Sequence, residues 1–274
     1  MKKPGRILLT AKARLLADNE THKNVGLIFF LLQLFCVITL IWTAVAGQYL
    51  YVLLSIATIL LLFVPWLVEA VFDIVISPPL KIIYMCCAVA GPVCGPIYKL
   101  YYLIPFWDTM LHTISGFLLA GIGFAIPEIT DRNNNNSPNL ILRMVLAFCF
   151  SMAAAVLWEF FEFSMDVIFH MDMQNDFVVN RITSYYLGTE LGQTGVIENI
   201  TNVTVNGTDL GLGGYLDIGL FDTMVDMIVN FVGAVVFCFA SSNETVARVF
   251  IPLVNQVSQE ETVENGITNS GQVI

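Results

Sequence analysis

The chain has 274 residues, of which 57% are hydrophobic and 12% are charged, and its formal net charge at pH 7 is −10. A soluble domain carries about 25% charged residues, so the composition excludes an ordinary soluble protein. The chain also has no basic block of the size that nucleic-acid binding requires, which excludes a nucleic-acid partner. The expected partner is the lipid bilayer.

The apolar residues are grouped in six blocks, each close to the roughly 20 residues that a helix needs to cross a bilayer. They predict an all-α membrane protein whose transmembrane domain, residues 25–240, is a bundle of six transmembrane helices. The predicted spans cover about 25–46, 49–68, 82–104, 108–126, 140–166 and 222–240. The third helix is expected to be kinked or broken, because Gly91-Pro92 and Gly95-Pro96 interrupt it.

The basic residues predict the orientation of the chain. If the N-terminus lies inside, the inner segments carry ten of the 12 Lys and Arg residues. The positive-inside rule then places both termini in the cytoplasm of a multi-pass protein of the cell membrane. Residues 1–24 are a basic cytoplasmic segment, 171–220 form an extracytoplasmic loop, and 241–274 form a polar cytoplasmic tail that is expected to be poorly ordered.

Ionisable side chains lie within three of the predicted spans, where they are costly and therefore typical of a functional site. The predicted topology puts all of them at the outer end of the bundle. A rotation of about 100° per residue groups them on one face of each helix. The candidate metal ligands are Asp108 and His112 in the fourth helix, Glu159, Glu162 and Asp166 in the fifth, and Asp222 and Asp226 in the sixth.

Carboxylates this close together cannot all stay ionised without a counter-charge. A bound divalent metal ion is the favoured explanation, and a network that carries protons is the alternative. The ligand types leave the metal open, because oxygen ligands with one imidazole suit Mg²⁺ or Mn²⁺ and also accept Zn²⁺ or iron. Glu159 and Glu162 are also candidate catalytic residues, since a spare carboxylate can act as a general base.

Structural roles compete with this hypothesis. Asp108 and Asp222 each precede Thr at the start of an apolar helix, so they are interpreted equally well as helix caps. His112 is alternatively a neutral core histidine. Asn230, with Gly233, is a candidate helix-contact position, because Asn bonds across helices and Gly allows close approach.

Three ordered motifs carry a family resemblance. Residues 107–116 read Trp-Asp-x-x-Leu-His-x-x-Ser-Gly, residues 158–166 read Trp-Glu-x-x-Glu-Phe-x-x-Asp, and residues 222–226 read Asp-Thr-x-x-Asp. This pattern resembles the YjdF-like family of bacterial and archaeal integral membrane proteins. The stretch from Asp222 to Ala234 is more distantly similar to the closing motif of VanZ-like proteins. The YjdF-like resemblance implies an integral membrane protein but no particular reaction.

Three hypotheses for the function follow. The first is a metal-dependent membrane enzyme that acts on a lipid-linked or envelope substrate by hydrolysis or group transfer. The second is an ion- or proton-coupled transporter, which the broken third span favours. Six spans without a clear two-fold repeat argue against a self-contained carrier, although a homo-oligomer could supply the second half. The third is a non-catalytic membrane partner protein, in which the acids only fix the helix register.

Overall fold

The computed structural model describes residues 4–130 and 139–251. The chain divides into two compact units. The first unit comprises Met1–Met152 and Asn230–Ile274, and the second unit comprises Ala153–Val229. The asparagine-rich stretch 131–138 and the part of the predicted tail at 252–274 lie outside the described residues.

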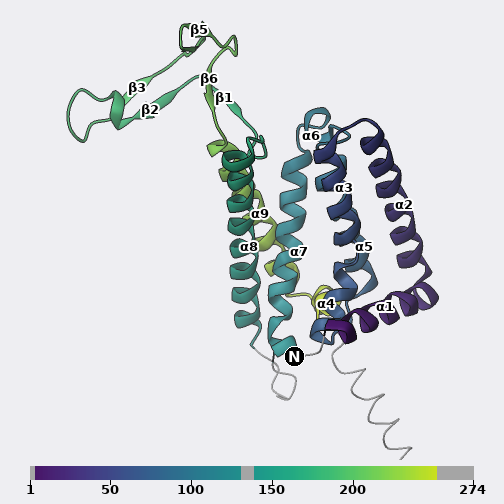
Figure 1. The fold of residues 1–274 in the computed structure, drawn as a ribbon. Coiled ribbons are helices and arrows are strands. Elements are labelled where there is room, and N and C mark those ends of the chain that lie inside the picture. The colour runs from purple at the N-terminus through teal and green to yellow at the C-terminus, as the bar shows by residue number, and fades with distance from the viewer. Residues whose placement is uncertain (1–3, 131–138, 252–274) are drawn as a thin grey trace, which may run out of the picture. The chain divides into compact units, whose positions relative to one another are not determined.

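The described part of the first unit is built from helices (Figure 1). They are α1 Pro4–Thr21, α2 Lys23–Val45, α3 Tyr49–Leu61, α4 Val64–Phe72, α5 Pro78–Val89, a π-helix Ala90–Cys94, α6 Leu100–Leu103, α7 Trp107–Thr130 and α10 Glu244–Phe250. Two longer helices, α8 Leu140–Phe169 and α9 Leu220–Ala240, run from one unit into the other. The described chain is therefore mostly helical, as its composition predicts.

Four helices among the described residues are long and apolar enough to cross a membrane. They are Lys23–Val45, Trp107–Pro127, Leu140–Phe169 and Leu220–Ala240, which match four of the six predicted spans. A fifth is present if α3 and α4, which are bent by 42° at a short break, form one span. Four to five spans are thus supported and six are not confirmed. The cytoplasmic placement of the termini stays a prediction.

The predicted third span, 82–104, differs most from the structure. Its apolar helix covers only Pro78–Cys94, and its last part is the π-helix. The interruption falls at Gly91-Pro92, where proline lacks the N–H that an α-helix would bond. The expected break is therefore present, and it leaves a helix too short to count as a span.

The chain after the last span was predicted to be poorly ordered from residue 241, and this is wrong for its first part. Asn243 accepts a hydrogen bond from the Thr245 N–H, which caps the start of α10. Phe250 at the end of α10 is only 8% exposed and packs against Phe117 and Phe237. Burial of this aromatic ring explains why the segment is ordered.

The backbones of α7 and of the α9 part of the first unit approach closely at two glycines. A Cβ atom on Gly116 would lie 2.3 Å from the Asn230 carbonyl oxygen, and one on Gly233 would lie 2.1 Å from the Thr113 carbonyl oxygen. The Asn230 amide donates to Ser151 Oγ at 3.2 Å, and Ser151 Oγ donates to the Gly116 carbonyl at 2.9 Å. Asn230 is therefore a helix-contact residue, as predicted.

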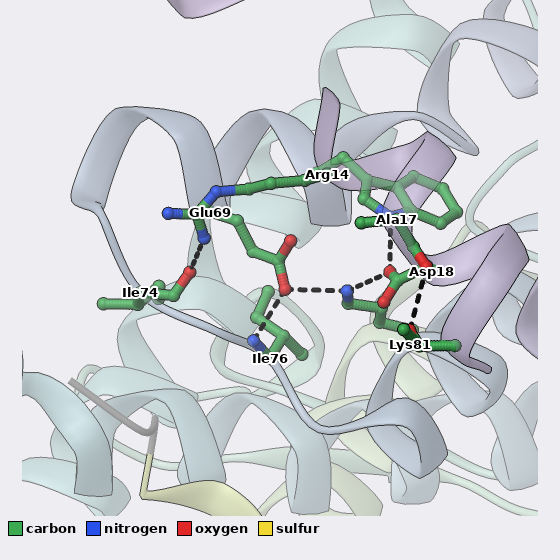
Figure 2. Close-up of polar contacts among 9 residues, drawn as sticks. Arg14, Ala17, Asp18, Glu69, Ile74, Ile76 and Lys81 are labelled. Atoms are coloured by element: carbon green, nitrogen blue, oxygen red, sulfur yellow. Dashed lines mark hydrogen bonds and ion pairs between the residues drawn. The ribbon is translucent and has the colours of Figure 1, made fainter. Parts of the chain in front are cut away.

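A buried ionic network, which the sequence analysis did not foresee, joins α1 to α4 and α5 (Figure 2). The Lys81 ammonium contacts both Asp18 and Glu69, and the Lys81 side chain is 2% exposed. Trp66 Nε1 donates to Asp18 Oδ2 at 2.7 Å, and the Ile76 N–H donates to Glu69 Oε1 at 2.7 Å. The network thus fixes α1 against the rest of the first unit.

The second unit combines the C-terminal part of α8, the start of α9 and six short strands, all within described residues. The strands are β1 Phe177–Val179, β2 Ile182–Ser184, β3 Gly195–Ile197, β4 Thr204–Val205, β5 Thr208–Asp209 and β6 Tyr215–Asp217. They form three antiparallel pairs, β1 with β6, β2 with β3 and β4 with β5, in an extension beyond the helix ends (Figure 1). The β1–β6 pair closes the predicted loop 171–220 at its base.

Candidate functional site

Three carboxylates meet inside the second unit, between α8 and α9. One oxygen each of Glu159, Glu162 and Asp226 lies within 4.8 Å of the other two. Glu159 is 4% exposed, Glu162 is 7% exposed and Asp226 is 2% exposed. All three residues are candidate metal ligands from the sequence, and the structure brings them together. Oxygen atoms at this spacing can bind one cation.

The helical periodicity of α8 and α9 produces this meeting. Glu159 and Glu162 are three residues apart in α8 and therefore share a face of the helix. Asp226 lies one turn after Asp222 in the first part of α9. The neighbouring side chains of both helices are mainly apolar, as expected for segments that cross a bilayer. The acids are consequently enclosed by apolar surface.

Glu159 has the most unusual environment of the three. Within the described residues, neither of its carboxylate oxygens has a hydrogen-bond donor in good geometry. The Thr223 hydroxyl lies close enough to interact with it, but this hydroxyl also accepts a hydrogen bond from Gln174 Nε2 at 2.5 Å. A buried carboxylate without hydrogen bonds is costly and is normally neutralised by a proton or bound to a cation.

Glu162 is held in place by its own helix. Trp158 Nε1 donates a hydrogen bond of 2.8 Å to Glu162 Oε1. The two residues are one helical turn apart, so the indole can reach the carboxylate without strain. This role of Trp158 was not predicted, although its spacing of four residues from Glu162 was a usable signal. The hydrogen bond orients Glu162 within the cluster.

Asp166 and Asp222, two further candidate ligands, bind the loop that follows α8. Asp166 accepts hydrogen bonds from the N–H groups of Met173 and Gln174 at 2.6 and 2.9 Å. Asp222 Oδ2 accepts one from the Asn175 N–H at 2.9 Å. Hydrogen bonds from backbone N–H groups to a carboxylate are strong. The structure therefore gives both acids a role in fixing the loop.

Asp172 lies in the same loop, outside the spans, close to other acids. Partial burial raises the pKa of its carboxyl group, and the negative charges of Asp176 and Asp166 raise it further. Three acids, Asp166, Asp172 and Asp176, thus lie close together where the chain leaves α8. This crowding of acids agrees with the net charge of −10 for the chain.

Asp108 and His112 belong to the first unit and lie one turn apart on α7. His112 Nε2 is 3.6 Å from Asp108 Oδ1, and the two side chains are 13% and 24% exposed. This contact is compatible with a core histidine that a carboxylate orients. The expectation that this pair joins the carboxylates of the second unit stays a prediction.

The cluster of Glu159, Glu162 and Asp226 has the chemistry of a site for a hard cation. Carboxylate oxygens are the preferred ligands of Mg²⁺, Mn²⁺ and Ca²⁺. Two ligands on opposite sides of an ion at about 2.4 Å are about 4.8 Å apart, so the spacing fits a single ion. Three protein ligands leave coordination positions open for water or substrate. The cluster could also hold a shared proton.

Comparison with known proteins agrees with the sequence motifs. A family model described as "Predicted membrane protein (DUF2238)" matches residues 28–243. The matched region contains all three motifs that resemble the YjdF-like family, which confirms that resemblance. No curated protein and no solved structure matches the chain. The similarity to VanZ-like proteins stays a prediction.

Proposed function

The chain belongs to the family "Predicted membrane protein (DUF2238)", and we propose that it is a membrane protein that binds a divalent cation through Glu159, Glu162 and Asp226. The cation would lie between α8 and α9, within the apolar span Leu140–Phe169. A protein that spans the bilayer rarely places acids in such a segment without a function, because their burial is costly.

The observation that carries this proposal is the state of Glu159. It is 4% exposed, and no described residue donates a well-formed hydrogen bond to either of its oxygens. Burying an ionised carboxylate costs several kcal/mol unless a partner compensates for it. A cation held with Glu162 and Asp226 supplies that compensation directly. A structural role alone gives no reason for leaving both oxygens of a buried acid without donors.

We infer that the cation serves chemistry on a lipid-linked or envelope substrate. A cation held within an apolar span lies at the depth of molecules that partition into the bilayer. A divalent ion with open coordination positions acidifies a bound water and polarises a phosphoryl or carbonyl oxygen. A carboxylate of the cluster that does not bind the ion would act as the general base toward that water. Hydrolysis or group transfer is the corresponding reaction class.

Cation-coupled transport is the second candidate, and two features of the first unit favour it. The pair α3 and α4 is bent by 42°, and α5 continues into a π-helix. Broken helices and π-helices are frequent at sites where transporters bind ions or move. The same cation site would then bind the coupling ion.

Metal analysis of the purified full-length chain tests the proposal. Mn²⁺ binding is measured by electron paramagnetic resonance for the wild type and for Glu159→Gln and Asp226→Asn. Glu190→Gln, an exposed acid of the same unit, is the matched control. We expect one saturable site in the wild type and the control, and its loss in both variants. Equal binding in all four proteins, or no binding in the wild type, would contradict the proposal.

A second measurement separates the two uses of the cation. The wild type is reconstituted in liposomes, and Mn²⁺ uptake is followed with a trapped indicator dye. Uptake that Glu159→Gln abolishes supports transport. Saturable Mn²⁺ binding without uptake supports the enzyme hypothesis. If the cluster holds a shared proton in place of a metal, the wild type binds no Mn²⁺. Raising the pH then releases a proton from the carboxylates, and Glu159→Gln lacks this release.

A further inference from the structure

The helix α1 lies crosswise to α2 at one end of the first unit (Figure 1). It ends at Thr21, and α2 begins at Lys23, so a single residue separates the two. Because α2 is apolar enough to cross a membrane, its start lies at the bilayer surface. Because α1 has 18 residues and runs crosswise to α2, it extends for about 27 Å along the membrane surface at the depth where α2 begins. The whole of α1 is thus held at the membrane–water interface.

The contacts of α1 with the first unit fix which of its faces points outward. Ala11 and Leu15 pack against the core cluster that contains Trp66. Arg14 pairs with Asp73 at 3.0 Å and donates to the Ile74 carbonyl, and Asp18 contacts Lys81 (Figure 2). These groups occupy one side of the helix, so α1 cannot rotate without breaking the buried network.

The opposite side of α1 carries exposed leucines and Lys12, with one acid, Glu20, near the end of the helix. Leu9 is 71% exposed and Leu16 is 52% exposed, and Leu8, at the edge of this side, is 65% exposed. Lys12 lies between Leu8 and Leu16, one turn from each, and Arg6 is exposed near the start of the helix. Leucines in this position would face water if nothing covered them. Long basic side chains beside them can extend toward a negatively charged surface.

We propose that the outward face of α1 binds anionic phospholipids of the surrounding membrane. The leucines enter the boundary between headgroups and acyl chains, and Arg6 and Lys12 contact the lipid phosphates. This combination is the one by which interfacial amphipathic helices bind membranes. The lipid that would bind this face is adjacent to it, because α2 enters the bilayer next to α1. The proposal uses only residues of the first unit and does not depend on the cation site.

The first test places an environment-sensitive fluorescent amino acid at position 9 of the full-length chain in lipid nanodiscs. We expect blue-shifted emission that nitroxide-labelled lipids quench and aqueous iodide does not. The same label at Tyr186, which is fully exposed in the second unit, is the control and should be quenched by iodide. Quenching of position 9 by iodide as strong as at position 186 would overturn the proposal. Protection from both quenchers would overturn it as well and would indicate a protein partner, such as a second copy.

The second test asks whether the bound lipid is anionic. Native mass spectrometry measures retention of phosphatidylglycerol and of phosphatidylcholine by the wild type and by Arg6→Gln, Lys12→Gln and the double variant. Each charge removed should lower the affinity for phosphatidylglycerol roughly fivefold and leave phosphatidylcholine unchanged. Arg248→Gln, which removes an exposed charge from α10, is the matched control. Equal losses for both lipids, or a loss in the control as large as in the α1 variants, would contradict the anionic specificity.

Discussion

Lys81 Nζ lies 2.7 Å from Glu69 Oε1, and each of the two side chains is only 2% exposed. The same ammonium contacts Asp18 of α1 and lies over the Trp66 ring, 5.6 Å from its centroid. Lys81 thus joins an acid from α1 to an acid from α4. An ion pair as deeply buried as this one is disrupted at high cost, because removing one partner leaves the other buried and charged.

Replacing Lys81 by methionine should therefore destabilise the protein by about 3–5 kcal/mol. The methionine fills a similar volume but leaves Asp18 and Glu69 without their cation. The measurement is the thermal unfolding midpoint of the purified chain in detergent, with Lys99→Met at an exposed position as the control. Combining Lys81→Met with Glu69→Gln should recover part of the loss. An unchanged midpoint for Lys81→Met would show that the network does not hold α1.

The close contact of α7 with α9 in the first unit depends on two glycines. Alanine at Gly116 or Gly233 would place a methyl group 2.3 or 2.1 Å from a backbone carbonyl oxygen, so the helices must separate. We expect a destabilisation of about 1–3 kcal/mol for each variant. Gly91→Ala is the control, because no atom lies within 4 Å of its added Cβ. Equal unfolding midpoints for all three variants would refute the close approach.

Helical periodicity together with the predicted span topology grouped the acids, and Glu159 and Glu162 do share a face of α8 and both meet Asp226. It could not assign Asp166 and Asp222, because their partners are backbone N–H groups of a loop whose path depends on tertiary contacts. The 3.6-residue period of an α-helix tells on which face of the helix an acid lies, but it does not give the path of the loop that follows α8. The ligand set from the sequence was therefore larger than the cluster in the structure.

Two other features lay beyond the sequence analysis for different reasons. Asp18 and Lys81 are 63 residues apart in the chain, and no local pattern links them. The β4–β5 hairpin, by contrast, had a local signal in Asn206-Gly207. Both residues have positive φ, 51° and 83°, as the tight turns that favour Asn-Gly require. Its strands could have been predicted from this dipeptide.

The hydrogen bond from Trp158 to Glu162 predicts a positioning role for the indole at the cation site. Trp158→Phe keeps the aromatic ring and removes the donor, so Glu162 is no longer oriented. If the cation site exists, its Mn²⁺ affinity should fall by about 10-fold or more, as it does when ligand-orienting groups are lost. Trp42→Phe, in α2 and half exposed, is the control. Unchanged affinity in Trp158→Phe would exclude this role.

Cation binding should also stabilise the folded protein. At a free Mn²⁺ concentration of 100 times its dissociation constant, the expected gain is about 2.7 kcal/mol. The unfolding midpoint should rise on addition of Mn²⁺ and return to its starting value on chelation. Glu159→Gln removes one of the three carboxylates of the cluster, so its midpoint should not respond. A shift of equal size in Glu159→Gln would show that the ion acts elsewhere.

The contribution of Asp172 to the stability of the loop after α8 should fall as the pH rises. Partial burial and the charges of Asp176 and Asp166 raise the pKa of Asp172 in the folded protein, so the folded state binds its proton more tightly. Stability from this group is complete below about pH 4, the usual value for aspartate, and falls above it. Hydrogen exchange of residues 170–176 should therefore be slower in Asp172→Asn than in the wild type at neutral pH, and equal in acid once intrinsic rates are removed. Slower exchange in the variant at both pH values would contradict a charge effect.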